Sequence, residues 1–468
     1  MVAAEWQHVV RRGLFPFLSQ SNARQAAFGA TLAILISYNA CLALSFGFFG
    51  SRGHSVVTGS LLFTLPLLLF LFSFRKSFRV QPADFIFAGL LIAALLSFFV
   101  NSQDNEANSA KEHLLLVASL AGYIACRPML AEDATVVRSA FERITAAIVL
   151  VGAIFTAAEI LNQWDGPPGK PKVFGFNAAG TYFMASLGFL VIAVVTVDQP
   201  RPQRTAIAAA LIFLPTVIFA AAMVRFTFLA LAGSMFVAMI LTERGKRWHI
   251  AVVALTIFLA VIVGLGARYN TAKVYAAYIL EQTVEISILG QPVETRAGAT
   301  EMPSCRLAVN TRNSIAIRQA LARDAIYLIP SAGLVGSGLD SFMRFSCIEA
   351  HHVHVSILQA AVEFGHLGGI FFMLLIGLAL YRLVPLAKHT GAIRFILCSL
   401  VFAVLLSFAH GRISRDSALF ALLGCAVGVC QFRRSTEELR MQHRRNGGPA
   451  LNRRTDAPFR TLRSSCPR

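Results

Sequence analysis

The sequence predicts an all-α, polytopic membrane protein of about twelve transmembrane helices with one large external loop, and three observations support this fold class. The 468 residues are 56% hydrophobic and only 14% charged, with a mean hydropathy of +0.64, whereas soluble domains carry roughly 25% charged residues. Apolar stretches of about 20 residues, the length that crosses a hydrocarbon core roughly 30 Å thick, recur along most of the chain. Lys and Arg gather in every second loop between these stretches.

The apolar stretches define the expected spans. One of them, from Ala206 to Leu241, is too long for a single helix and contains one charged residue, Arg225, so we expect two helices that turn near Arg225. The expected spans are residues 27–49, 55–73, 82–100, 113–131, 138–161, 177–197, 206–223, 227–242, 249–266, 364–383, 393–411 and 415–431.

The basic loops predict the orientation of the chain. They comprise residues 75–79, 127–143, 201–204, 244–247 and 382–394. Because Lys and Arg concentrate in cytoplasmic loops, we expect both termini to be cytoplasmic and the segment between the ninth and tenth spans to be external. The chain then divides into spans one to nine, the external loop, spans ten to twelve and a C-terminal tail. The boundaries of these parts are 1–266, 267–363, 364–431 and 432–468.

The net charge of +18 does not predict a nucleic-acid partner. Residues 432–468 carry ten Arg against Glu437, Glu438 and Asp456, a net charge of +7 in a polar, glycine- and proline-punctuated stretch. We expect this stretch to be a disordered tail that faces the anionic lipids of the inner leaflet.

The external loop contains an amphipathic helix and two cysteines. Ile317, Leu321, Ala325 and Leu328 form one apolar stripe of a helix. We expect this helix to end near Pro330, where glycines 333, 336 and 338 predict a turn-rich loop. We expect this helix to lie along the membrane surface. The remaining feature is the pair Cys305 and Cys347, for which we predict a disulfide because an exported loop permits one; free thiols are the alternative.

Three arginines are candidate anion ligands. Arg225 is a lone guanidinium between two apolar helices, and a fixed, always-charged fork binds phosphate well. Arg318 and Arg323 lie five residues apart on the amphipathic helix, hence about 140° apart around its axis, so they do not point the same way. For each of them, extension to lipid headgroups or pairing with an acid such as Asp324 is the alternative.

Three histidines fall within four residues where the external loop returns to the membrane. His351, His352 and His354 cannot all face one way in a helix or a strand, and no Cys or carboxylate stands at a recurrent metal-ligand spacing. We therefore predict no metal site and no cofactor.

From His354 the chain reads "HVSILQAAVEFGHLG", which resembles the signature of the bacterial O-antigen ligase and O-antigen polymerase families. His354, Gly365 and Gly368 match that signature at the right spacing, whereas Val355 stands where an amide or hydroxyl side chain is usual. Upstream, "RQALARDAIYLIPSAGLVGSGLDSF" is similar to a second family segment. Its matching residues are Arg318, Gly336, Gly338 and Phe342, and Ala322 replaces a usual Trp.

The resemblance implies a GT-C-like glycosyltransferase of the bacterial inner membrane with a periplasmic active site. It implies that a glycan is transferred from undecaprenyl pyrophosphate to a sugar hydroxyl of the lipid A core. A pyrophosphate leaving group needs cations, which Arg225, Arg318 and Arg323 would supply. The acceptor hydroxyl needs a base that is neutral near pH 7, and His354 is the candidate. We expect an inverting, metal-independent single displacement, since no paired carboxylates suggest a covalent intermediate.

Three further residues are candidates for supporting roles: His352 to orient the acceptor, Glu363 to hold a histidine or an arginine, and Arg412 to add to the anion site. The alternatives are no specific role for His352, an interfacial carboxylate paired with a backbone amide for Glu363, and contact with lipid headgroups for Arg412. Two other functions stay open. A polymerase or a protein O-oligosaccharyltransferase of the same superfamily would use another acceptor. A lipid-glycan transporter would carry charged residues at mid-depth in several spans, and these are nearly absent here.

Overall fold

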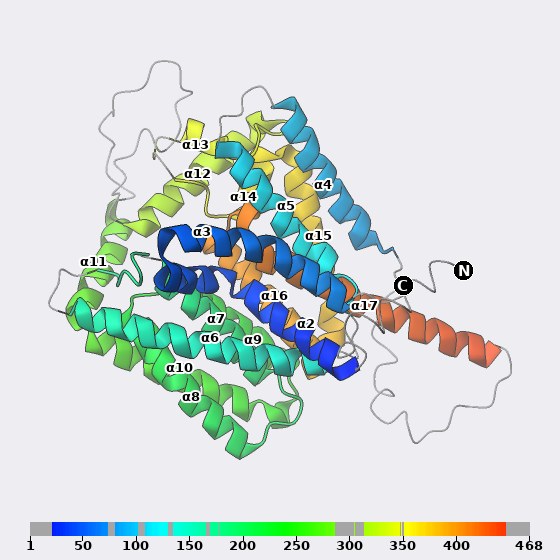
Figure 1. The fold of residues 1–468 in the computed structure, drawn as a ribbon, viewed down its shortest axis with the longest axis horizontal. Coiled ribbons are helices and arrows are strands. Elements are labelled where there is room, and N and C mark those ends of the chain that lie inside the picture. Colours follow the sequence, from blue (N-terminus) through cyan, green and yellow to red (C-terminus); the bar gives the residue numbers. More distant parts are fainter. Residues whose placement is uncertain are drawn as a thin grey trace.

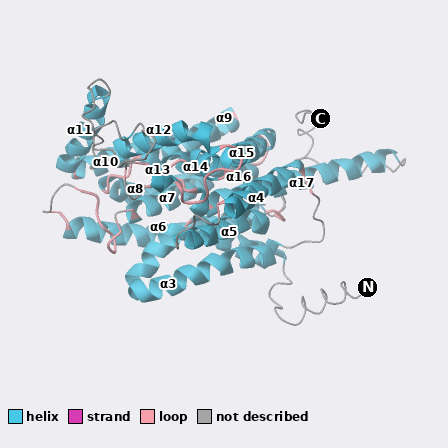
Figure 2. Cartoon of the chain, turned by 90° about the horizontal axis from the view of Figure 1, so that it is seen from above, coloured by secondary structure: helices cyan, strands magenta, loops and turns pink. Residues whose placement is uncertain are grey.

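The structure is a computed structural model, and within the part that it describes the chain is helical, with no β-strand and a single isolated bridge between Val173 and Phe176 (Figures 1 and 2). The described residues are 21–73, 80–101, 108–129, 134–164, 169–176, 178–285, 304, 313–346, 348 and 351–445.

The helices follow the apolar stretches closely. Their bounds are α2 (Ser21–Ile36), α3 (Tyr38–Ser73), α4 (Pro82–Val100), α5 (Asn108–Cys126), α6 (Ala134–Asn162), α7 (Ala179–Val195), α8 (Pro202–Ala221), α9 (Phe226–Leu241), η3 (Arg244–Lys246), α10 (Trp248–Ala267), α11 (Tyr269–Glu285), α12 (Ser314–Ala332), α13 (Phe342–Phe345), α14 (Ser356–Glu363), α15 (Gly365–Ala387), α16 (Gly391–His410), η5 (Ile413–Arg415) and α17 (Ser417–Arg445).

Six of the described helices are long and apolar enough to cross a membrane: α4, α6, α8, α10, α15 and α16. A seventh span results if α2 and the first part of α3 count as one span that bends by 75°. Each of the twelve expected stretches overlaps a helix, but α7, α9 and residues 59–72 and 417–431 form shorter apolar helices. The chain is a polytopic, membrane-embedded protein, and the number of twelve spans stays a prediction.

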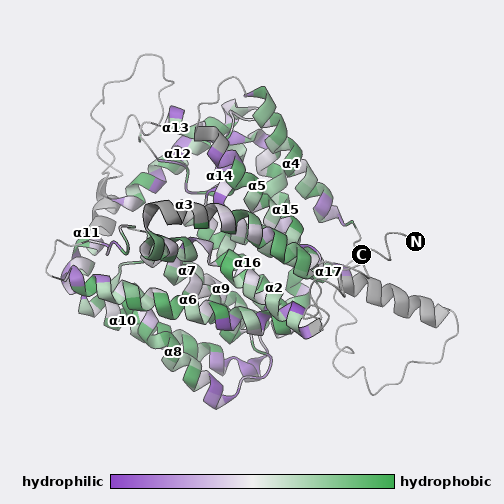
Figure 3. Ribbon diagram, in the orientation of Figure 1, coloured by the Kyte–Doolittle hydropathy of each residue, from purple (hydrophilic) through white to green (hydrophobic). Residues whose placement is uncertain are grey.

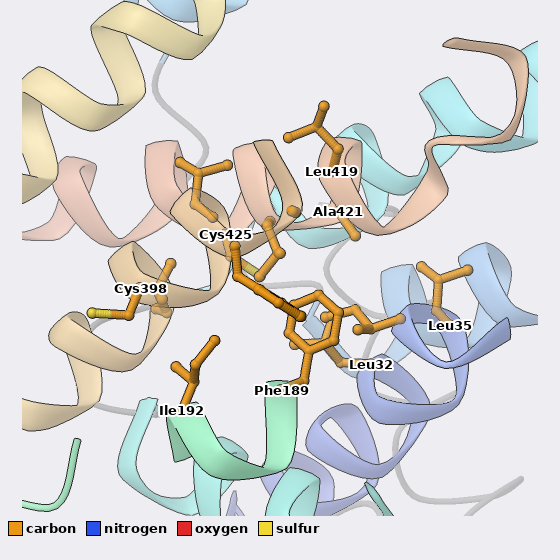
Figure 4. Close-up of a cluster of buried hydrophobic side chains, with 14 of the residues drawn as sticks. Leu32, Leu35, Phe189, Ile192, Cys398, Leu419, Ala421 and Cys425 are labelled. Carbon is orange, nitrogen blue, oxygen red and sulfur yellow. The ribbon is translucent and has the colours of Figure 1, made fainter. Parts of the chain in front are cut away.

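Helix α7 is short because it lies inside the bundle. Of its 17 residues, 14 are buried, among them Phe189 and Ile192, which pack against Leu32 and Leu35 of α2 and against α16 and α17 (Figure 4). Helix α10 is the opposite case, with only five of 20 residues buried. Its exposed side chains include Phe258 and Ile262. Figure 3 shows the outer helices α4, α6, α8 and α10 as predominantly hydrophobic, as expected of surfaces that face lipid.

The two ends of α7 mark the two ends of the bundle. At its C-terminal end the predicted basic loops meet: Gly391 N donates to Asp198 Oδ1 over 2.5 Å, and Arg204 pairs with Glu142 at 3.0 Å. At its N-terminal end lie the turn between α8 and α9 and the segments α11 to α14, of which α11 is at the left and α12 and α13 are at the upper left of Figure 1. All the candidate site residues described below belong to this second end.

Candidate functional site

A tight turn between α8 and α9 positions Arg225. The chain leaves α8 at Ala221, and Met223 adopts a left-handed backbone (φ 59°), which a non-glycine residue rarely does. Arg225 is then the first residue before α9. Its guanidinium lies over the ring of Tyr275 in α11, 4.4 Å from the centroid, and Nη1 donates to the Tyr275 carbonyl over 3.4 Å. The predicted turn near Arg225 is confirmed.

Helix α12 brings Arg318 beside this turn. Asn313 caps the helix, since its Oδ1 accepts from the amide of Ile315 over 3.0 Å. The predicted apolar stripe is buried, which fixes the rotation of the helix, and Arg318 then lies with its guanidinium 4.7 Å from the ring centroid of Phe226. Arg323 is exposed on another side of α12. Asp324 is buried, but it accepts from Ser304 and Ser346 instead of pairing with either arginine.

Three cations line one small pocket, which we call the cation pocket. Arg225 and Arg318 are joined there by Lys170, from the glycine- and proline-rich loop that precedes α7. Burial, followed by the charges of Arg318 and Arg225, lowers the pKa of Lys170 to about 8. Burial and Arg225 lower the pKa of Arg318 to about 10, so both groups remain charged at pH 7. The other lining residues are Thr181, Met223, Val224, Phe226, Ser314 and Ile315.

Among the described residues, the lining of the cation pocket contributes three positive side chains and no carboxylate. The free volume is about 10 Å³, room for about one water, so a phosphate group must push the flexible ends of these side chains apart. The pocket therefore suits an anionic group that carries more than one negative charge.

The histidine loop, residues 351–355, runs between α13 and α14 close to the cation pocket. His354 is half-buried. Burial lowers its pKa to about 4, helped by the positive charges of Arg318, His351, Arg412 and His352. The charge of Arg318 thus reaches His354, although His354 does not itself line the cation pocket. At pH 7 its imidazole is uncharged and able to accept a proton.

A second polar cluster contacts the histidine loop through His352. We call it the Asp340 cluster, and its members are Asp340, His352, Arg412, Glu112 and Arg415. Asp340 Oδ1 is 3.0 Å from His352 Nδ1 and 3.4 Å from Arg412 Nη2. Arg412 also pairs with Glu112 of α5 at 3.2 Å, and Arg415 pairs with Glu112 at 2.5 Å. Burial would raise the pKa of Asp340, but the hydrogen bond from His352 and the charges of His352 and Arg412 outweigh it and hold that pKa below its usual range. His352 and Arg412 are thus held by carboxylates.

Glu363 is the last residue of α14 and is fully buried. Burial raises the pKa of its carboxyl to about 8, so the group is protonated at neutral pH. Its Oε2 accepts from Gln359 Nε2 over 2.8 Å, and Gln359 Oε1 accepts from the amide of Ile413 over 3.0 Å. Gln359 therefore joins α14 to η5, and Glu363 holds the Gln359 side chain in place. We expected Glu363 to hold a histidine or an arginine. Of these residues, Arg412 influences Glu363, and it does so through its charge.

Two glycines of the sequence motifs meet backbone to backbone. Gly336 and Gly365 both have a left-handed backbone, with φ of 81° and 73°. A Cβ atom on Gly336 would lie 2.3 Å from the amide nitrogen of Gly365, and a Cβ on Gly365 would lie 2.6 Å from the amide nitrogen of Gly336. Amides at residues 337 and 338 donate to the carbonyls of Val362 and Glu363, both over 3.1 Å. The glycine turn after α12 is thereby fastened to the junction of α14 and α15.

The structure thus brings Arg225 and Arg318 into one pocket, sets His354 beside it, and puts His352 and Arg412 into the Asp340 cluster. Arg323 does not line the pocket. Cys305 and Cys347 lie outside the described residues, so their pairing stays a prediction. Among the residues that are described, no group of three His, Cys, Asp or Glu side chains could hold a metal ion.

Three residues of the site were missed at the sequence level: Lys170, Glu112 and Asp340. Lys170 had a signal, because it stands in the loop "GPPGKPK" directly before an apolar stretch. The two acids are single carboxylates near the ends of segments, and nothing in their local sequence predicts their partners. No family model and no curated protein matches the chain.

Proposed function

We propose that this protein is an O-antigen ligase: a glycosyltransferase of the bacterial inner membrane that transfers a glycan from undecaprenyl pyrophosphate to a sugar hydroxyl of the lipid A core on the periplasmic face. The observation that carries the proposal is the cation pocket beside His354. A diphosphate is the multiply charged anion that three clustered cations favour, and an uncharged imidazole next to it is what activation of a hydroxyl requires.

The proposed reaction is a single displacement at the anomeric carbon of the donor. His354 accepts the proton of the acceptor hydroxyl as its oxygen attacks that carbon. The bond from the anomeric carbon to the phosphate oxygen breaks, and the electron pair leaves with the pyrophosphate. Arg225, Arg318 and Lys170 stabilise the negative charge that develops on this leaving group. Attack opposite the leaving group inverts the anomeric configuration.

The Asp340 cluster has an indirect role in this proposal. His352 Nδ1 lies 3.0 Å from Asp340 Oδ1 and 3.1 Å from Arg412 Nη2, and these two contacts fix the loop that carries His354. Arg412 is neutralised by Asp340 and Glu112, so it contributes less to the anion site than the cations of the pocket. His352 and Arg412 are therefore proposed as positioning residues.

The acceptor separates the ligase from its alternatives. A polymerase or a protein O-oligosaccharyltransferase would use the same cation pocket and the same base, and the choice of a ligase depends on the spacing of His354, Gly365 and Gly368. A lipid-glycan transporter would not need a proton acceptor beside the pyrophosphate.

The test is carried out in the native bacterium. A strain with His354→Ala should accumulate full-length polyprenyl-linked glycan while its lipopolysaccharide stays uncapped. Arg318→Gln should give the same phenotype, whereas Arg323→Gln, on the exposed side of the same helix, is the matched control and should leave capping largely intact. Glycan chains reduced to single repeats would favour the polymerase, and unchanged lipopolysaccharide in the His354→Ala strain would refute the proposal.

A further inference from the structure

A second cavity of about 120 Å³ lies next to the cation pocket, and we call it the inner cavity. It is enclosed by the bend between α2 and α3, by α7 and α16, and by the starts of α9 and α17. Polar side chains from all these elements line it, and the important ones are Tyr38, Asn39, Tyr182, Thr227, Arg415 and Asp416. At roughly 10–15 Å³ for each water, the space suits about ten heavy atoms, the size of one sugar ring.

The two cavities adjoin each other at α7. Thr181, in the first turn of this helix, lines both of them. A ligand whose charged group occupies the cation pocket therefore has its next chemical group on the side of Thr181 where the inner cavity lies, or must displace the Thr181 side chain to reach it.

The two cavities differ in charge. Three cations line the cation pocket, whereas the single guanidinium of the inner cavity, Arg415, is paired with Glu112 at 2.5 Å. Asp416, which has the opposite charge, is half-buried and accepts from the Ser356 hydroxyl. The inner cavity is thus nearly neutral but rich in hydroxyl, amide and phenol groups, a lining that fits an uncharged polyhydroxylated ligand.

One of these groups lacks a partner. Thr227 is fully buried, and its hydroxyl has no hydrogen-bond partner among the described residues. Buried threonines further along the helices, such as Thr216 and Thr242, donate to the carbonyl four residues earlier. Thr227 is only the second residue of α9, so that residue, Met223, lies outside the helix. An unpaired buried hydroxyl is destabilising, and a bound ligand that supplies a hydrogen-bond partner would relieve this cost.

We propose that the inner cavity binds the sugar that is attached directly to the pyrophosphate of the donor, with Thr227 as one of its hydrogen-bond partners. This inference rests on the proposed function, because the cation pocket must hold the pyrophosphate. The donor is then recognised in two parts: its diphosphate by charge and its first sugar by hydrogen bonds. An isoprene unit of the carrier lipid, the other occupant to consider, would leave the polar lining unsatisfied.

Binding measurements on the purified full-length chain in detergent test this. The two probes are farnesyl pyrophosphate and the same lipid carrying one N-acetylglucosamine on its pyrophosphate. We expect the wild-type protein to bind the sugar-bearing probe more tightly. Thr227→Val, which keeps the shape of the side chain, should weaken binding of that probe by about three- to tenfold and leave the sugar-free probe unchanged.

Thr145→Val is the matched control. Thr145 in α6 is also fully buried with no hydroxyl partner among the described residues, but it lines neither cavity, so its replacement should change neither affinity. Asn39→Leu, at the exposed edge of the inner cavity, is the second variant and covers the case that Thr227→Val does not fold.

The outcomes separate this inference from the function on which it rests. Equal affinity of the wild-type protein for both probes would overturn the sugar site, and so would tighter binding of both by Thr227→Val, which would point to an isoprene unit in the cavity. Loss of sugar-free binding in Arg318→Gln would still support the cation pocket. Failure of the wild-type protein to bind either probe would refute the proposed function itself.

Discussion

Asp340 Oδ1 lies 3.0 Å from His352 Nδ1, and the backbone of Asp340 is left-handed, with φ of 71°. A non-glycine residue in this region is strained unless its surroundings hold it there. The carboxylate contacts His352 and also faces Arg412, so one residue combines a strained backbone with two polar side-chain contacts. Asn and Asp tolerate this backbone better than other residues.

Replacement of Asp340 by Asn should therefore keep the turn and remove only the charge. We expect kcat for glycan transfer to fall about tenfold with little change in the KM for the lipid donor, because Asp340 acts through the histidine loop and does not line the cation pocket. Initial rates at varied donor concentration measure this. A rise in KM at constant kcat would mean that Asp340 supports donor binding instead.

The low pKa of His354 predicts an unusual pH profile. Since a general base works in its uncharged form and the pKa of His354 is about 4, kcat/KM should stay nearly constant from pH 7 down to about 5. Bound pyrophosphate offsets the charge of Arg318, so the acid limb of kcat should lie at higher pH than that of kcat/KM. An acid limb of kcat/KM near pH 6.5 is typical of an unperturbed histidine, and it would contradict the low pKa of His354.

Glu363 should make the folded protein less stable as the pH rises. Its folded pKa of about 8 lies above the ordinary value of 4.5, so its contribution to stability is complete below pH 4.5 and is lost as the pH rises through about 8. Glu363→Gln keeps an uncharged group of the same shape. The melting temperature of this variant relative to wild type should therefore increase between pH 5 and 9. A difference that is independent of pH would show that Glu363 does not titrate in this range.

The contact between Gly336 and Gly365 predicts a graded effect of three alanine variants. Gly333→Ala adds a Cβ that meets nothing within 4 Å, so it carries only the backbone cost of about 1–3 kcal/mol. Gly336→Ala and Gly365→Ala add a backbone collision to that cost and should lower the melting temperature and the activity further. Thermal denaturation of all three in one detergent ranks them, and equal losses would mean that the two segments separate easily.

An ion pair at the other end of the bundle should matter for stability alone. Arg127 is 2% exposed, and its Nε lies 2.8 Å from Asp84 Oδ1. Asp84→Ala removes the carboxylate that neutralises this buried guanidinium and should cost about 3–5 kcal/mol. Adding Arg127→Met should recover part of the loss. Transfer per folded molecule should be unchanged in both variants, and a specific loss of activity would link this end to the site.

Local patterns predicted much of the fold. Apolar stretches located the helices, the lone charge at Arg225 located the turn between α8 and α9, and the stripe from Ile317 to Leu328 identified the buried face of α12. The length of an apolar stretch predicted the membrane spans less well, because a length criterion assumes that each helix contacts lipid from end to end. Helix α7 is enclosed by protein and needs only 17 residues, and the bend at Ser37 divides one apolar stretch into two helices.

The site was only partly predictable, because its geometry depends on residues far apart in the chain. Arg225, Arg318 and His354 each stood out by type or by motif. Lys170 comes 55 residues before Arg225, and its approach to the pocket depends on how the loop before α7 packs. The partners of Asp340 and Glu112 likewise come from other helices, and a single sequence contains no signal for such pairs.

The fastening of the glycine turn to the α14–α15 junction has a practical consequence. Asp340 and all three clustered histidines lie in the chain between Gly338 and Val362, and the two ends of this segment are tied together by the hydrogen bonds from Ser337 and Gly338 to Val362 and Glu363. Both ends of this segment are therefore fixed in the fold. If the whole segment were exchanged between related chains and both backbone hydrogen bonds were kept, the acceptor preference of the proposed transfer should change while the rest of the protein stays as it is.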